Sequence, residues 1–350
     1  MGDTRGPKPF IAICMDKHIV LGIGTNRHRT VPLALILIAL TATGGFYLLQ
    51  SRAASGRRSL VVSTTTSLYD TGVLDEIEEA FEAESQIDLY FISVGTGLAI
   101  THAKRGDADM ILVHAPPREL AFMEKGYGVC RKIIAYNFFA IVGPGDDPAG
   151  IGGLAPTEAL GKLVGGGRDG LAIWVSRGDD SGTHSKEKVL LTGVGFDVSA
   201  LREEDWYREA GTGMGKTLQI AEELEAYTLS DMGTYLKYRK EGLVALDVLV
   251  GEGEELINVY SAIAVNPEAN PDANFDDAVA FIEYLSSEEG QAIFSGYGAD
   301  SYGEALFNPA DELLKTRADQ VAASWIEEAA FFEGSECPPQ FRAGQAQLYD

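Results

Sequence analysis

The chain has 350 residues, of which 45% are hydrophobic, and a formal net charge of −24 that arises from 52 acidic and 28 basic residues. This length allows one large or two medium domains with an ample hydrophobic core. A surface this acidic argues against nucleic acid and against anionic lipid as binding partners.

The N-terminal residues 1–54 are predicted to be a leader. No charged residue occurs between Arg29 and Arg52, and residues 31–49 are nearly all apolar, which is about the length that spans a bilayer. Small residues around Ala53 give a cleavage signal, so the segment is either a cleaved signal peptide or a membrane anchor, and both remain open. Met15 is an alternative start that would shorten the leader. The rest of the chain is predicted to be periplasmic or extracytoplasmic, with membrane contact only through this segment.

Two cysteines, Cys130 and Cys337, lie outside the leader. In an exported protein they either form a disulfide or remain as buried thiols, and the sequence leaves both open. The five histidines are scattered along the chain, and the sequence has no Cys-x-x-Cys pair. No metal site and no cofactor is therefore predicted.

The first predicted strand, residues 60–63, runs into five consecutive hydroxyl side chains, Ser63-Thr64-Thr65-Thr66-Ser67. A helix is predicted at residues 73–84, because apolar side chains recur there with helical spacing. Backbone N–H groups at a helix start have no intrahelical partner and carry partial positive charge, so hydroxyls at such a place favour an oxyanion. Helix capping is the alternative, but a cap needs only one or two hydroxyls.

A glycine-rich turn, Gly95-Thr96-Gly97, follows the second predicted strand, residues 89–94. Taken alone, these glycines indicate only a tight turn between a strand and a helix. In a largely parallel sheet, however, the carboxyl ends of the strands meet at one edge. Thr96 is therefore predicted to lie beside the hydroxyl run, and another strand at residues 110–114 extends the same sheet.

Two longer apolar strands are predicted at residues 133–142 and 257–265, each ending just before a Gly-Pro or Asn-Pro pair. They are interpreted as crossovers between two lobes, one of which is inserted in the other. Strand-like and helical segments alternate over residues 59–300, which is typical of an α/β fold with largely parallel sheets.

Arg177 follows a further predicted strand, residues 171–176, and precedes Ser181-Gly182-Thr183 at the start of a predicted helix. Its planar guanidinium is always protonated and suits an oxyanion with several equivalent oxygens. The alternative is a surface ion pair with Asp179 or Asp180, and either carboxylate could instead orient the guanidinium. The third motif is the only one of the three that adds a fixed cation.

Two other chemistries are weighed against anion binding. Ser181 has no plausible His and Asp partners in the sequence, which disfavours a serine hydrolase. Residues 210–217 nearly match a phosphate-binding P-loop, but that motif must follow a buried strand. The preceding residues 203–209 are acidic and are predicted to be helical or irregular, so the segment is interpreted as a glycine-rich entry into a helix at 217–225.

The remaining elements complete the two lobes. A short strand at residues 227–231 leads into a helix at 232–240, with Ser230 or Asp231 as its N-cap. Helices are also predicted around residues 278–285 and over 311–332. Residues 333–350 are predicted to form a tail laid on the surface.

Five segments together resemble one known family, the tungstate-binding solute receptors of ABC transporters, within the type II periplasmic-binding-protein class. The matching segments are STTTSLYDTG from Ser63, SVGTG from Ser93, GDAD from Gly106, RGDDSGTH from Arg177 and YTLSDMGTYL from Tyr227. They occur in the family's order over roughly residues 59–300. At the level of the class, the resemblance is shared with molybdate and phosphate receptors.

The resemblance implies an α/β fold of two lobes, each with a mixed but mostly parallel sheet, that are joined by two crossover strands and close on one tetrahedral oxyanion. The expected domains are the leader 1–54, lobe I from residues 58–138 and 260–332, lobe II from 141–257, and the tail 333–350. A binding role carries over to eight residues: Thr65, Thr66, Ser67, Thr96, Arg177, Ser181, Gly182 and Thr183.

The function that the resemblance implies is that of an exported, monomeric receptor, not an enzyme. It would bind tungstate, or molybdate of nearly the same size, and deliver the anion to an ABC permease and its ATPase. The alternatives are a molybdate or phosphate receptor and, from a different class, a membrane-anchored module that senses an anion.

Overall fold

The computed structural model describes residues 56–251 and 253–349, and Arg57–Asp350 form one compact unit. The predicted leader, with Met15 and the apolar residues 31–49, lies outside the described residues. In the part that is described, no helix is both long and apolar enough to cross a membrane.

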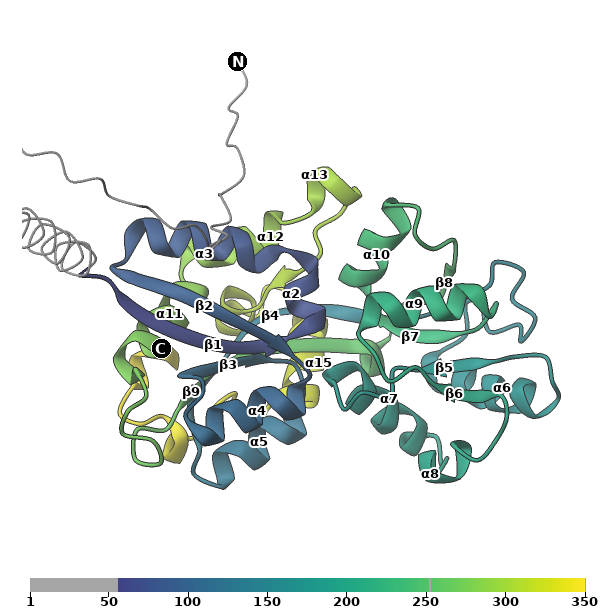
Figure 1. The fold of residues 1–350 in the computed structure, drawn as a ribbon, viewed down its shortest axis with the longest axis horizontal. Helices are drawn as coiled ribbons and strands as arrows, with labels where there is room; N and C mark the ends of the chain where they lie inside the picture. The colour runs from purple at the N-terminus through teal and green to yellow at the C-terminus, as the bar shows by residue number, and fades with distance from the viewer. Residues whose placement is uncertain (1–55, 252, 350) are drawn as a thin grey trace, which may run out of the picture. The chain divides into compact units, whose positions relative to one another are not determined.

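The sheet of the first lobe has the strand order β10 (Asn308–Pro309), β4 (Gly128–Gly143), β9 (Ile257–Val265), β3 (Met110–Val113), β1 (Arg58–Thr65) and β2 (Ile87–Val94). All of these strands except β10 are labelled in Figure 1. β1 pairs in parallel with β2 and β3, whereas β9 is antiparallel to β3 and β4. Because Thr65 is in register with Val94, the hydroxyl run and the Gly95 turn emerge at the same edge of the sheet.

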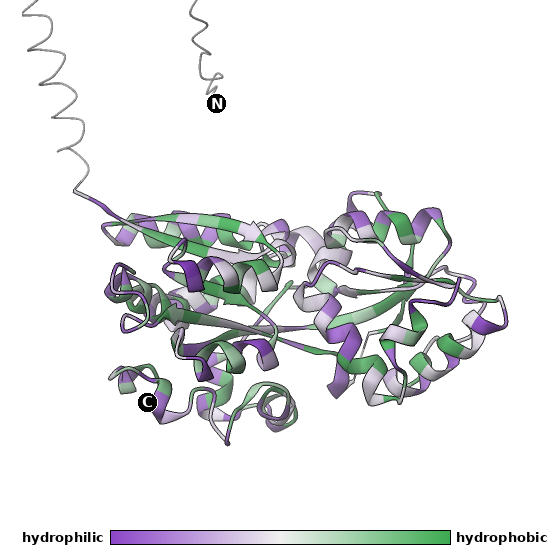
Figure 2. Cartoon of the chain, turned by 60° about the horizontal axis from the view of Figure 1, so that its bottom comes forward, coloured by the Kyte–Doolittle hydropathy of each residue, from purple (hydrophilic) through white to green (hydrophobic). Residues whose placement is uncertain are grey.

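Helices cover both faces of this sheet. All four residues of β3 are buried, and they alternate between two cores: Met110 and Leu112 face one, and Ile111 and Val113 face the other. The first core receives α3 (Val73–Glu84), α11 (Phe275–Ser286) and α12 (Glu288–Gly296), and the second receives α4 (Thr96–Arg105) and α5 (Pro116–Glu124). Figure 2 shows hydrophobic colour concentrated on the strands and mixed colours along the covering helices.

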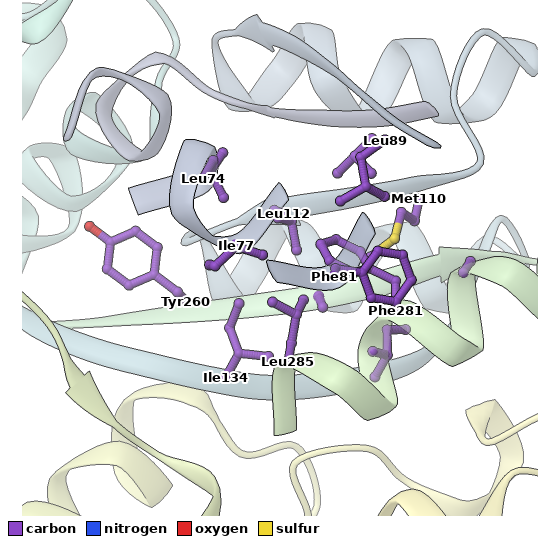
Figure 3. Packing of buried hydrophobic residues seen from close by; sticks show 14 of the residues in the cluster. Leu74, Ile77, Phe81, Leu89, Met110, Leu112, Ile134, Tyr260, Phe281 and Leu285 are labelled. Atoms are coloured by element: carbon purple, nitrogen blue, oxygen red, sulfur yellow. The ribbon is translucent and has the colours of Figure 1, made fainter. Parts of the chain in front are cut away.

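The packing of α3 explains why the predicted helical spacing produces a helix here. Leu74, Ile77 and Phe81 point from α3 into the first core, where they meet Leu112 of β3 and Phe281 of α11 (Figure 3). The solvent side of α3 carries acidic residues. Two of them lie in the first turn, where their negative charge interacts favourably with the positive end of the helix dipole.

The second lobe is built on the end of β4. β7 (Thr228–Asp231) and β8 (Asp247–Val250) pair antiparallel with β4, while β5 (Trp174–Ser176) and β6 (Tyr207–Glu209) form a parallel pair. Its helices are α6 (Pro156–Arg168), α7 (Gly182–Gly193), α8 (Val198–Leu201), α9 (Met214–Glu223) and α10 (Met232–Lys240). This lobe has hydrophobic cores of its own, which contain residues such as Phe139, Trp174 and Leu218.

β4 and β9 connect the two lobes. β4 pairs with β9 over residues 128–138 and with β7 and β8 over residues 139–143. All nine residues of β9 are buried. The remaining elements are α2 (Thr66–Thr71), α13 (Ala299–Tyr302), α14 (Asp311–Thr316), α15 (Gln320–Ala330) and the 3-10 turns η1 (Glu254–Leu256), η2 (Pro339–Phe341) and η3 (Ala346–Tyr349).

Three predicted elements differ from the structure. The helix predicted over residues 311–332 is two helices, because Arg317 adopts a left-handed conformation (φ 53°) after α14 and Asp319 then caps α15. The strand predicted from residue 171 begins only at Trp174, and Leu171 is exposed. Residues 203–209 are not wholly helical or irregular, since they end in β6.

The C-terminal segment is more deeply embedded than a tail laid on the surface. Cys337 is fully buried and Leu348 packs into the first core of lobe I. Glu336 accepts hydrogen bonds from Lys132 Nζ (2.8 Å) and from the backbone of Ile133 (2.9 Å), both on β4. The segment therefore supplies countercharge to a buried lysine.

Cys130 and Cys337 are both buried, free thiols in this structure. Burial, and secondarily the nearby Cys337 sulfur, raise the pKa of the Cys130 thiol to about 12. Since the thiolate is the reactive form, Cys130 is expected to be inert at neutral pH.

Candidate functional site

The hydroxyl run lies at the junction of β1 and α2. Thr65 is the N-cap of α2, and its Oγ1 accepts a hydrogen bond from the Leu68 N–H at 3.3 Å. Thr64 Oγ1 donates to the Leu112 carbonyl (3.1 Å), and Ser63 Oγ lies 3.1 Å from His102 Nδ1. Capping thus accounts for one of the five hydroxyls, and Ser63, Thr64 and Ser67 bond within lobe I. Thr66 instead contacts Arg177 of lobe II.

Thr96 begins α4 directly after β2. Its side chain is fully buried, and within residues 56–251 and 253–349 its Oγ1 finds no hydrogen-bond partner. An unpaired buried hydroxyl costs about 1–3 kcal/mol, so a partner outside the protein, a ligand or a water, is expected there. A Cβ added to Gly97 would come within 2.5 Å of Asp180 Oδ2, so a side chain there would displace the Asp180 carboxylate of the third motif from its present position.

Arg177 links the first motif to the third. It follows β5, its side chain is 1% exposed, and its Nε donates to Asp179 Oδ2 at 2.9 Å. Its Nη2 donates to Thr66 Oγ1 (2.6 Å), and its Nη1 lies 3.4 Å from Thr183 Oγ1. Arg177 does pair with Asp179, but the pair is largely buried and is not the surface ion pair weighed as the alternative, and it occupies only one edge of the guanidinium. The other edge faces hydroxyls from both lobes.

The start of α7 completes the third motif. Ser181 is the N-cap, and its Oγ accepts from the His184 N–H, while its own N–H donates to Asp179 Oδ1. The N–H groups of Gly182 and Thr183 lie in the first turn of a twelve-residue helix, so they have no intrahelical acceptor and lie at the positive end of the helix dipole. A Cβ on Gly182 would lie 2.6 Å from the ring of His114, so only glycine fits against lobe I at this point.

Glu187 holds α7 and β5 in place behind Arg177. This fully buried carboxylate accepts hydrogen bonds from Trp174 Nε1 (3.0 Å), Ser176 Oγ (2.9 Å) and Tyr207 OH (2.5 Å). Trp174 and Ser176 belong to β5 and Tyr207 to β6, so one side chain ties the α7 helix to both strands of the pair.

The pH dependence of stability should report this buried carboxylate. Burial raises the pKa of Glu187 in the folded protein, although the hydrogen bonds oppose the shift. The folded chain therefore keeps a proton on Glu187 at a higher pH than the unfolded chain does. Relative to Glu187→Gln, the wild type should gain free energy of unfolding as pH falls from neutral, and the gain should level off below the ordinary pKa of 4.5. Urea denaturation of both proteins between pH 7 and 4 measures this difference, and a pH-independent difference would contradict it.

Further contacts cross between the lobes. Arg118 on α5 forms an ion pair with Asp180, and its Nη1 also donates to the Asp180 carbonyl at 3.0 Å. The Arg118 hydrogen bonds lower the pKa of Asp180, so the pair stays charged. Lys237 on α10 donates to the Asp70 carbonyl of α2. Together with the Arg177–Thr66 bond, these contacts hold the two lobes against each other at the site.

The structure brings together the three predicted motifs, through contacts among Thr66, Arg177 and Thr183 and between Gly97 and Asp180. Sequence reasoning missed His114, whose ring lies between Ser67 and Gly182, and Arg118. His114 follows β3 at the same sheet edge as the hydroxyl run and the Gly95 turn, and that position was the available signal. The N-cap of α10 is Asp231, one of the two residues predicted for it.

Comparison with known proteins places these features in context. A family model described as a PBP superfamily domain matches residues 50–289. The tungstate-binding protein TupA of Peptoclostridium acidaminophilum is 40% identical over 251 residues, which cover 72% of this chain and 85% of that protein.

Two solved structures are also similar. One is the tungstate-binding protein TupA from Desulfovibrio alaskensis G20, with a TM-score of 0.62 and 38% identity over 72% of this chain and 98% of that one. The other is the tungstate ABC transporter structure from Geobacter sulfurreducens, with a TM-score of 0.61 and 41% identity over 68% of this chain and 98% of that one.

Proposed function

Because the chain belongs to the PBP superfamily, we propose that it is the solute-binding protein of an ABC importer and that its ligand is tungstate. Its relatives are named as tungstate-binding proteins. These comparisons confirm the resemblance seen in the sequence, the type II periplasmic-binding-protein fold, and the class of binding protein as opposed to enzyme.

The observation that carries the proposal is the position of Arg177. A guanidinium that is 1% exposed carries a full positive charge, and Asp179 neutralises only one of its edges. The two terminal nitrogens face Thr66 of lobe I and Thr183 of lobe II. A divalent oxyanion bound between them would satisfy the remaining charge and would draw both lobes onto the same ligand.

We assign the lining of the site to the eight residues singled out in the sequence: Thr65, Thr66, Ser67, Thr96, Arg177, Ser181, Gly182 and Thr183. Arg177 supplies the charge. Thr66, Thr96 and Thr183 supply hydroxyl donors, since Thr66 and Thr183 only accept from Arg177 and Thr96 has no partner among the described residues. Gly182 and Thr183 also supply the N–H groups at the start of α7.

Selectivity for a fully deprotonated anion follows from the carboxylate nearest to Arg177. Both oxygens of Asp179 already accept hydrogen bonds, one from Arg177 and one from the Ser181 N–H. The proton of hydrogen phosphate would have to share a carboxylate that Arg177 and the Ser181 N–H already hold, which disfavours that anion. Tungstate and molybdate carry the same charge and have nearly the same size, so this argument does not separate them.

The partners proposed for the chain are an ABC permease and its ATPase. Anion binding would favour the arrangement in which both lobes contact the ligand, and the permease would recognise that arrangement. The protein would act as a monomer outside the cytoplasm, where residues 1–54 deliver it either as a cleaved signal peptide or as an anchor. The Arg118–Asp180 pair and the Lys237 contact are the inter-lobe bonds that opening would break.

Calorimetric titration of the protein with tungstate, molybdate, sulfate and phosphate tests the proposal. We expect heat of binding with tungstate, with one site per chain, and weak or no binding of phosphate. Tighter binding of phosphate or sulfate than of tungstate would contradict the proposed ligand. No binding of any of the four anions would contradict an oxyanion receptor of this type.

A further inference from the structure

A chain of buried polar side chains runs from the candidate site to both crossover strands. Ser67 Oγ lies 3.1 Å from His114 Nε2, and His114 Nδ1 lies 2.8 Å from Asn258 Oδ1. Asn258 Nδ2 donates to Asn137 Oδ1 (2.8 Å), and Asn137 Nδ2 donates to the Leu306 carbonyl (3.1 Å). The four side chains Ser67, His114, Asn258 and Asn137 belong to residues at most 4% exposed.

The backbone carbonyl at one end fixes the direction of every hydrogen bond in this chain. Leu306 O can only accept, so the amide nitrogen of Asn137 must face it and the Asn137 oxygen must face Asn258. The Asn258 nitrogen therefore faces Asn137, and its oxygen faces His114. His114 must then carry its proton on Nδ1.

The proton position on His114 determines what Ser67 can do. Burial lowers the pKa of His114 to about 4, so the ring is neutral at physiological pH and its Nε2 is an acceptor. The single hydroxyl proton of Ser67 is then donated to Nε2 at 3.1 Å; its other hydroxyl neighbour, Thr65 Oγ1, is at 3.4 Å, beyond the usual range. That proton points into lobe I and is not offered to an anion.

This chain of hydrogen-bonded side chains also reaches both crossover strands and the start of α7. Asn137 on β4 and Asn258 on β9 are directly paired in the crossover strands. On the other side, the ring of His114 fills the space that a side chain at position 182 would need, next to the start of α7 in lobe II. His114 also stacks on Tyr260 of β9, with ring centroids 5.0 Å apart.

We propose that His114 is a positioning residue of the oxyanion site. It accepts the hydrogen bond of the Ser67 hydroxyl and, through Asn258 and Asn137, fixes the first-lobe half of the site to both crossover strands. The inference rests on the proposed function for its binding readout. It assigns Ser67 to the internal chain and leaves the hydroxyl donors to the anion on Thr66, Thr96 and Thr183.

The test is a double-mutant cycle on tungstate affinity with Ser67→Ala, His114→Phe and the double variant. Phenylalanine keeps a ring to stack on Tyr260 and removes both nitrogens. We expect His114→Phe to weaken tungstate binding roughly tenfold, the effect of about one buried hydrogen bond. The double variant should bind no more weakly than His114→Phe alone, because both substitutions break the same chain. If Ser67 instead donated directly to the anion, His114→Phe would bind tungstate like the wild type, and the double variant would lose only what Ser67→Ala loses; that result would overturn the assigned role.

His102 provides a matched control, since its Nδ1 lies 3.1 Å from Ser63 Oγ in the same hydroxyl run but outside the candidate site. His102→Phe should bind tungstate like the wild type, and a loss equal to that of His114→Phe would overturn the assigned role. The ¹⁵N signals of His114 in the ligand-free wild type give a second readout that needs no variant. An Nδ1–H tautomer supports the chain and an Nε2–H tautomer overturns it, even if no anion binds and the proposed function fails.

Discussion

Arg177→Ala should weaken tungstate binding by about 3 kcal/mol, a factor of roughly 100 in Kd. The guanidinium is 1% exposed, so its attraction for a dianion is screened little by water. Its removal also leaves Thr66 Oγ1 and Thr183 Oγ1 without the donor that orients them across the two lobes. Isothermal calorimetry of the variant and the wild type measures the loss.

Two further variants separate this role from a general effect of charge. Arg177→Lys keeps the positive charge but cannot bond Asp179, Thr66 and Thr183 at once, so it should recover only part of the lost affinity. Arg168→Ala removes an exposed arginine of the same lobe, whose partner is Glu204, and should bind like the wild type. Affinity in Arg177→Ala within threefold of the wild type would show that the site lies elsewhere.

The parts of the site that could be predicted are those with a local signature. The hydroxyl run, the Gly95 turn and the Arg177 segment each combine small or hydroxyl residues with the end of an apolar strand. Parallel pairing gathers the first two at one edge of the lobe I sheet, whereas the Arg177 segment follows β5 in the separate sheet of lobe II. A local signature also explains why the strand Ile257–Val265 and the helix Val73–Glu84 have the predicted bounds. Their hydrophobic patterns depend only on neighbours in sequence.

The polar chain behind the site could not be predicted, because its members are far apart in sequence. His114 and Asn258 are 144 residues apart, and each is a single polar residue beside or within an apolar run. A local pattern reveals that Asn137 and Asn258 interrupt the crossover strands, but not that they are paired in register. The same limit explains why the contact of Glu336 with Lys132, across 204 residues, was not predicted.

Lys132 gives the second large expected effect, this time on stability. Its ammonium is 2% exposed on β4 and lies 2.8 Å from both Asp311 and Glu336. Burial alone would lower the pKa of Lys132, but the two carboxylates raise it above its usual value, so the lysine is charged in the folded protein. A buried charge of this kind is tolerated only while its partners remain.

Glu336→Gln should therefore lower the free energy of unfolding by about 3 kcal/mol. A neutral amide offers one oxygen where the carboxylate used two, so either Lys132 Nζ or the Ile133 N–H would face another donor. Glu333→Gln removes the same charge from an exposed position three residues earlier and should change stability by less than about 0.5 kcal/mol. Guanidinium denaturation of the two variants compares them directly. Equal stabilities would mean that the C-terminal segment does not hold Lys132 in solution, whereas the expected gap would make this segment part of the folding unit of lobe I.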